Sequence, residues 1–135
     1  MSKTVVSPYA NCSKISPESY LFQANSSLGP KIIRKLKQGN YVLEATLDLH
    51  GYILSQAEDT LEEFIQECLE DSLRCVLIIH GKGSQAILKN HVNDYLQYHS
   101  QVLAFCSAKS KDGGTGAIYA LLKKQHSTGD NCEEK

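Results

Sequence analysis

Hydrophobic and polar residues form four short patterns along the chain that are typical of β-strands. Residues 46–50, Thr-Leu-Asp-Leu-His, alternate between polar and apolar side chains, which predicts a strand with one buried face. Residues 75–79 are continuously apolar, as in a strand nearer the centre of a sheet. Residues 102–106 repeat this apolar pattern, and residues 117–122 do so after the glycine-rich stretch 107–116. The sequence therefore predicts four strands.

Between the strands, apolar residues recur every three or four positions and predict two amphipathic helices. The first spans about residues 56–72, and Ser55 with Glu58 matches a capping box at its start. The second spans about residues 85–98. Acidic residues fill the solvent face of the first helix, so we assign them no catalytic role. The residues expected to face the core are Ala57, Leu61, Phe64, Ile65, Cys68 and Leu69 in the first helix, and Ile87, Leu88, His91, Val92, Tyr95 and Leu96 in the second.

The elements follow one another in the order β-α-β-α-β-β, which predicts an α/β fold. Strands that alternate with helices are usually parallel and joined by right-handed crossovers, so the helices pack on the sheet. A chain of 135 residues suits one compact domain. We place this domain at residues 41–124, between a basic extension at 1–40 and a polar tail at 125–135.

Composition excludes several classes of protein. No apolar stretch approaches the ~20 residues that span a bilayer, and the N-terminus lacks the pattern of a secretory signal. The five cysteines are odd in number and do not have the spacing of zinc ligands. We therefore expect no zinc site and a cytoplasmic protein with free thiols.

The basic extension predicts an interaction surface. Residues 1–40 carry six basic residues and one acidic residue. Residues 1–28 are polar and irregular, so we expect the extension to be partly disordered. A short helix is expected from Lys31 to Gln38, because Pro30 favours a helix start. We interpret its basic residues as a docking element for ribosomal RNA or a ribosomal partner. The alternative is a helix that merely packs on an uncovered face of the sheet.

Two histidines follow the first two predicted strands. The carboxyl ends of parallel strands meet at one edge of a sheet, where open α/β sheets bind ligands. If the strands are neighbours, His50 and His80 lie about 5 Å apart at the backbone. Residues two apart on a strand share a face, which places Asp48 beside His50. The sequence therefore predicts that these three residues surround one anion.

The stretch His80-Gly81-Lys82-Gly83 leads from a strand into a helix. Backbone N–H groups at a helix start and the positive end of the helix dipole favour a phosphate. Lys82 adds a positive charge. This loop therefore predicts a phosphate-binding site next to the histidines.

Three motifs in this order resemble the small MutS-related (Smr) domain: LDLHG at 47–51, HGKG at 80–83 and DGGTGA at 112–117. The resemblance covers about residues 44–124 and implies a two-layer α/β sandwich with two main helices. Its mixed four-stranded sheet would have the order 1-2-4-3 with the fourth strand antiparallel. The basic extension is similar to those of small stand-alone bacterial members.

The resemblance also implies endonuclease activity. Members nick DNA or cleave RNA, and some bacterial ones cut messenger RNA on stalled or collided ribosomes. The motifs assign catalytic roles to Asp48, His50 and His80. The residues expected to contact phosphate or nucleic acid are Gly81, Lys82, Gly83, Gly113, Gly114 and Gly116.

We interpret the histidines as a general acid–base pair for RNA cleavage. Two near-neutral pKa values would let one histidine take the 2′-hydroxyl proton and the other protonate the leaving 5′-oxygen. Asp48 would orient His50, while Lys82 and loop N–H groups would stabilise the phosphorane. This scheme uses no metal or other cofactor, whereas an alternative has Asp48 bind Mg²⁺. Two other functions stay open: DNA nicking in repair or recombination, and binding of nucleic acid or ribosomes without cleavage.

Overall fold

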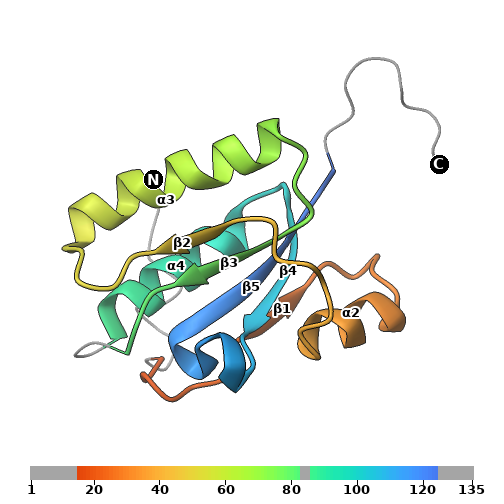
Figure 1. The fold of residues 1–135 in the computed structure, drawn as a ribbon, viewed down its shortest axis with the longest axis horizontal. Coiled ribbons are helices and arrows are strands. Elements are labelled where there is room, and N and C mark those ends of the chain that lie inside the picture. Colours follow the sequence, from red (N-terminus) through yellow and green to blue (C-terminus); the bar gives the residue numbers. More distant parts are fainter. Residues whose placement is uncertain (1–14, 83–85, 125–135) are drawn as a thin grey trace.

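A computed structural model describes residues 15–82 and 86–124 and shows a mixed β-sheet with helices on both faces (Figure 1). In the described ranges, the helices are α2 (Pro30–Lys37), α3 (Leu54–Glu70) and α4 (Ile87–Tyr98). The strands are β1 (Phe22–Ala24), β2 (Thr46–Asp48), β3 (Cys75–Ile79), β4 (Val102–Ser107) and β5 (Ala117–Leu122). Two short 3-10 turns, Ser110–Asp112 and Gly114–Gly116, connect β4 to β5.

The sheet has the order β1-β4-β5-β3-β2. Strands β2 and β3 are parallel, while β5 lies antiparallel between β3 and β4. The predicted α/β fold, the strand order 1-2-4-3 and the antiparallel last strand are therefore confirmed for β2 to β5. The predicted number of four strands is wrong, because the extension adds β1 antiparallel to the outer edge of β4.

The sheet buries a different apolar cluster on each face. On one face, α3 and α4 pack Leu61, Ile65 and Val92 against Leu49 and Ile78. These helices and the sheet form the two expected layers, and Leu49 faces the helices as predicted.

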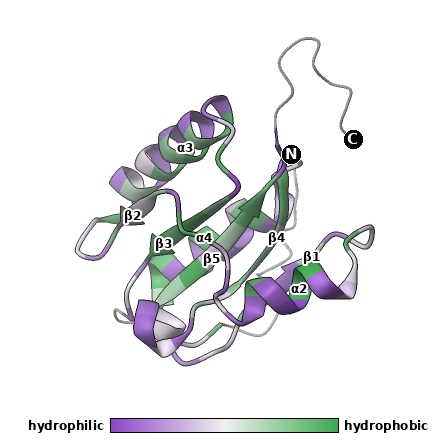
Figure 2. Ribbon diagram, turned by 45° about the vertical axis from the view of Figure 1, so that its right-hand side comes forward, coloured by the Kyte–Doolittle hydropathy of each residue, from purple (hydrophilic) through white to green (hydrophobic). Residues whose placement is uncertain are grey.

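Helix α2 adds a partial layer on the other face of the sheet. Its Leu36 is 1% exposed and belongs to a second cluster with Leu77, Tyr119 and Leu121. Figure 2 shows polar residues over most of the outer surface of α2. The inner side of α2 thus packs on the sheet, while its basic residues Lys31, Arg34, Lys35 and Lys37 remain exposed.

Two details of the helix starts differ from the prediction. Helix α3 begins at Leu54, so Ser55 lies inside the first turn and the predicted Ser55–Glu58 capping box is wrong. Instead, the Ile53 N–H donates to Gln56 Oε1 at 3.4 Å. Helix α4 begins at Ile87, which is 50% exposed although it was expected to face the core.

No helix in the described ranges is long and apolar enough to cross a membrane. Cys68, Cys75 and Cys106 are free and buried. They act as small apolar residues in the core.

Candidate active site at the ends of β2 and β3

Residues after β2 and β3 lie side by side because these strands are parallel neighbours. Asp48 is paired with Ile79, and the Leu49 N–H donates to the Ile79 carbonyl at 2.7 Å. Continuing this register aligns His50 with Gly81. A Cβ atom placed on Gly81 would lie 3.4 Å from the His50 Cβ, which supports that alignment. The first two motifs therefore meet at one edge of the sheet, as the sequence predicts.

Asp48 and His50 form a solvent-exposed pair. The His50 Nδ1 lies 2.8 Å from Asp48 Oδ1, and the His50 backbone N–H donates to the same oxygen at 3.0 Å. These two hydrogen bonds lower the pKa of Asp48 below its usual value. Because a carboxylate accepts, Nδ1 carries the proton and Nε2 remains able to exchange one. The His50 side chain is 72% exposed, so a substrate can reach its ring.

His80 is buried, unlike His50. The residue is 2% exposed, and its Nδ1 lies 2.7 Å from the Gly81 carbonyl oxygen. Since a carbonyl oxygen only accepts, Nδ1 of His80 carries a proton. Burial lowers the pKa of His80 to about 4. The predicted pair of near-neutral histidines is therefore wrong for His80, because burial removes water from around its ring.

Both histidines nevertheless line one pocket of about 870 Å³. Its sides are the loop between β2 and α3, the turn from His80 to Lys82 and the first residues of α4. The structure thus brings Asp48, His50, His80, Gly81 and Lys82 into one region. Of the two imidazole rings, only that of His50 is open to solvent. Gly83 lies outside the described residues.

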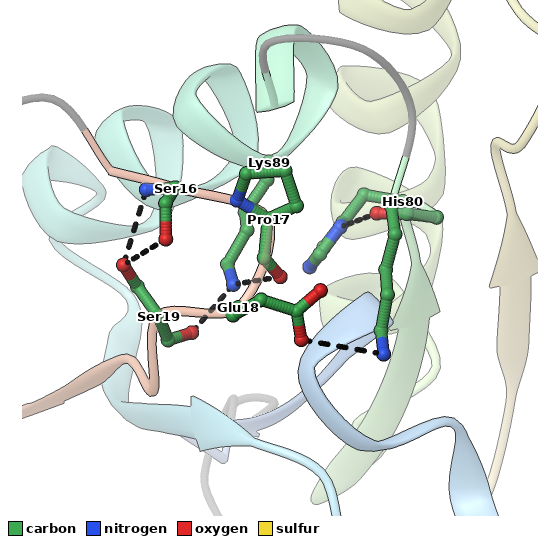
Figure 3. Close-up of polar contacts among 8 residues, drawn as sticks. Ser16, Pro17, Glu18, Ser19, His80 and Lys89 are labelled. Atoms are coloured by element: carbon green, nitrogen blue, oxygen red, sulfur yellow. Dashed lines mark hydrogen bonds and ion pairs between the residues drawn. The ribbon is translucent and has the colours of Figure 1, made fainter.

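The N-terminal segment is held against this region by a buried lysine. Lys89 on α4 is 1% exposed, and its Nζ donates to the Pro17 carbonyl at 3.0 Å and to the Ser19 carbonyl (Figure 3). Glu18 forms an ion pair with Lys82 at 3.7 Å. Burial lowers the pKa of Lys89 below its usual value.

The burial of Lys89 was not predicted from the sequence, because charged side chains usually lie on the surface. A signal was present, since Lys89 precedes the core residues Val92 and Leu96 by one and two helical turns. The three residues therefore share one face of α4.

Gly116 braces the turn after β3. Its carbonyl accepts the His80 N–H at 3.0 Å and the Gly81 N–H at 2.9 Å. Both N–H groups are therefore occupied and do not supply the predicted contacts to a phosphate. A Cβ on Gly116 would lie 3.4 Å from the Lys82 Cγ, so Gly116 lies directly beside the Lys82 side chain.

Gly113 and Gly114 shape the connection between β4 and β5. Both have positive φ angles, +119° and +58°, which favour glycine. Neither lines the pocket that contains His50. These two glycines therefore allow the turn between β4 and β5, and their contact with phosphate stays a prediction.

No group of three His, Cys, Asp or Glu side chains in the described ranges lies close enough to hold a metal ion. The alternative scheme with Mg²⁺ therefore rests on Asp48 alone among the predicted site residues, with further ligands drawn from substrate or water.

Comparisons with known proteins place this geometry in a family. The family model of the Smr domain matches residues 47–123. The ribosome rescue factor SmrB of Tolumonas auensis is 36% identical over 92 residues, which cover 68% of this chain and 52% of that protein. SmrB of Buchnera aphidicola is 40% identical over 91 residues, which cover 67% of this chain and 51% of that protein. The chain spans about half the length of these curated relatives.

Solved structures extend the likeness to the fold. A stand-alone small MutS-related protein from Escherichia coli, YdaL, gives a TM-score of 0.74 at 35% identity, covering 82% of this chain and 88% of YdaL. The Smr domain of Thermus thermophilus MutS2 gives a TM-score of 0.56 at 24% identity, covering 58% of this chain and 98% of that domain, and supports the fold alone. Since the family match includes β3 to β5, most of β2 and both histidine motifs, the chain belongs to the Smr domain family.

Proposed function

We propose that this protein is an endonuclease that cleaves RNA, with the Asp48–His50 pair as its catalytic centre. The observation that carries the proposal is the 2.8 Å contact between Asp48 Oδ1 and Nδ1 of an exposed imidazole. This contact fixes the tautomer that leaves Nε2 free for proton transfer. Membership in the Smr family supports a nuclease, since this family includes endonucleases.

The reaction is a transesterification at phosphorus. His50 Nε2 takes the proton of a ribose 2′-hydroxyl as that oxygen attacks the adjacent phosphate. The bond from phosphorus to the 5′-oxygen breaks, and this oxygen takes a proton from water or from protonated His50. The products are a 2′,3′-cyclic phosphate and a 5′-hydroxyl.

The neighbouring residues have supporting roles in this mechanism. Asp48 orients the His50 ring through its contact with Nδ1. Lys82 is half exposed and offers a positive charge to the phosphate. His80 takes no part in proton transfer, because burial closes its ring to a substrate and lowers its pKa to about 4, which makes it a weak base.

The test compares three matched substrates: an RNA, the same RNA with 2′-O-methyl groups, and a supercoiled DNA. We expect cleavage of the unmodified RNA alone, in excess chelator, with cyclic phosphate ends. Cleavage of the 2′-O-methyl RNA or the DNA would reject this mechanism and favour the DNA-nicking alternative. Binding of RNA without any cleavage would favour the non-catalytic alternative.

We also propose that α2 docks the protein on ribosomal RNA. The relatives are named ribosome rescue factors, and α2 exposes Lys31 and Arg34 to solvent. Phosphate contacts by basic side chains make binding depend on salt concentration.

Replacing both residues with glutamine should weaken ribosome binding and reduce the slope of log affinity against log salt by about 2. Sedimentation with ribosomes over a salt series measures this. The double variant Lys123→Gln and Lys124→Gln removes the same charge from the end of the described chain and should bind as the wild type does. Equal binding by both double variants would contradict docking through α2.

Substitution is preferable to deletion for this test. Removing residues 1–40 would also remove β1, Leu36 from its cluster and the carbonyl partners of Lys89. Loss of ribosome binding after such a deletion would report damage to the fold as much as loss of a docking surface.

A further inference from the structure

Exposed apolar side chains are concentrated around the pocket that contains His50. In the described ranges, eight large hydrophobic residues are exposed, and four of them line this pocket. Their exposed fractions are 39% for Tyr52, 63% for Ile53, 40% for Leu54 and 50% for Ile87. Exposed apolar patches of this kind mark interaction sites.

The backbone explains why these residues are not in the core. The Tyr52 N–H donates to the Leu49 carbonyl at 3.0 Å, which turns the chain sharply after His50. Residues 52–54 therefore lie before the buried positions of α3, which begin at Ala57. Ile87 is the first residue of α4 and lines the same cavity.

We propose that Tyr52, Ile53, Leu54 and Ile87 form a binding site for a nucleobase adjacent to the phosphate at His50. The inference rests on the proposed function and adds a substrate contact to it. A phosphate within reach of His50 Nε2 is joined to nucleosides on both sides, so at least one base must lie within a nucleotide's length of the imidazole. The apolar side chains are the part of the pocket suited to its flat face.

The composition of the pocket favours a nucleotide over a protein segment. The lining combines His50 and Lys82, which suit an anion, with an apolar surface. A nucleotide carries both features in one unit. Tyr52 supplies a ring for stacking, and the aliphatic side chains supply contact without hydrogen-bond donors. Such a site accepts any base, because every base has a π face.

The chain offers a direct probe of stacking, because it contains no tryptophan. We expect the fluorescence of a Tyr52→Trp variant to be quenched by a short 2′-O-methyl oligonucleotide, which has no free 2′-hydroxyl. An abasic oligonucleotide of the same length and charge should leave the fluorescence nearly unchanged. Equal responses to both strands would overturn the proposal.

Affinity provides the second measurement. Tyr52→Ala and Ile87→Ser should each raise the Kd for the 2′-O-methyl strand by about tenfold and leave the weaker Kd for the abasic strand unchanged. Tyr98→Ala and Val42→Ser are matched controls, since these side chains are 59% and 79% exposed and do not line the pocket. Equal losses for both strands, or a loss in the controls as large as in the test variants, would overturn it.

These results are separable from the test of the nuclease. Binding is read with strands that lack the 2′-hydroxyl, so it is independent of cleavage. A protein that prefers the base-bearing strand but cuts no RNA would reject the nuclease and support the base site. A protein that cuts RNA but binds both strands equally would support the nuclease and reject the base site.

Discussion

His50→Ala should reduce the rate of RNA cleavage by about a thousandfold, within the range that general acid–base catalysis supplies. The substitution removes the exposed imidazole, whereas the fold loses only the contact with Asp48. Asp48→Asn should have a smaller effect of about 10- to 100-fold, because it removes an orienting partner and retains the ring. Single-turnover cleavage of one labelled RNA measures both rates.

The matched control for this experiment is His99→Gln. His99 follows the last turn of α4, at the opposite end of the helix from the pocket. The His99→Gln variant should cleave RNA at the rate of the wild type, and circular dichroism verifies that it is folded. If His50→Ala cleaves as fast as His99→Gln, the Asp48–His50 pair is not the catalytic centre. If cleavage then stops on chelation, the Mg²⁺ scheme replaces it.

His80 should make the folded protein less stable as the pH falls from 6.5 to 4. Burial lowers its pKa from 6.5 to about 4 in the folded state, so the unfolded chain takes up this proton first. The unfolded state binds more protons in that window, and the free energy of unfolding therefore falls as the pH falls. The contribution is complete above pH 6.5, is lost by about pH 4, and is on the order of 3 kcal/mol.

Urea unfolding at pH 7.0 and about pH 4.5 tests this expectation, with His80→Gln as the comparison. The variant has no titratable side chain at position 80, so its free energy of unfolding should change less between the two pH values than that of the wild type. Should His80→Gln fail to fold, the imidazole resonances of the wild type give the same information. The resonances of the His80 ring should not shift between pH 5 and pH 8. A titration midpoint near pH 6.5 for this ring would contradict the burial argument.

The sequence predicted the parts of the fold that have long periodic patterns. The apolar positions of α3, including Leu61 and Ile65, and the alternation of β2 gave the elements and the faces of Leu49 and Asp48 correctly. Strand β1 has three residues and depends on β4 for its partner, so its local pattern carries no signal. The predicted start of α3 was wrong, because the side chain of Gln56, and not that of Glu58, accepts a backbone N–H at the start of the helix.

The position of the candidate site was predicted correctly, but the burial and the low pKa of His80 were not. The ends of parallel neighbours brought His50 next to Gly81, as expected. The burial of His80 was not predicted, because it depends on tertiary packing of α4 and the N-terminal segment around the end of β3. The bonds from His80 and Gly81 to Gly116 could not be read either, since 35 positions separate the last two residues in the sequence.

The last strand of the described residues, β5, lies inside the sheet, and this determines when the pocket can form. Strand β5 pairs with both β3 and β4, and Gly116 directly before it holds the turn at His80 and Gly81. A nascent chain that still has Leu122 in the exit tunnel lacks these bonds. The pocket therefore matures only after nearly all of the described chain has left the ribosome that makes it.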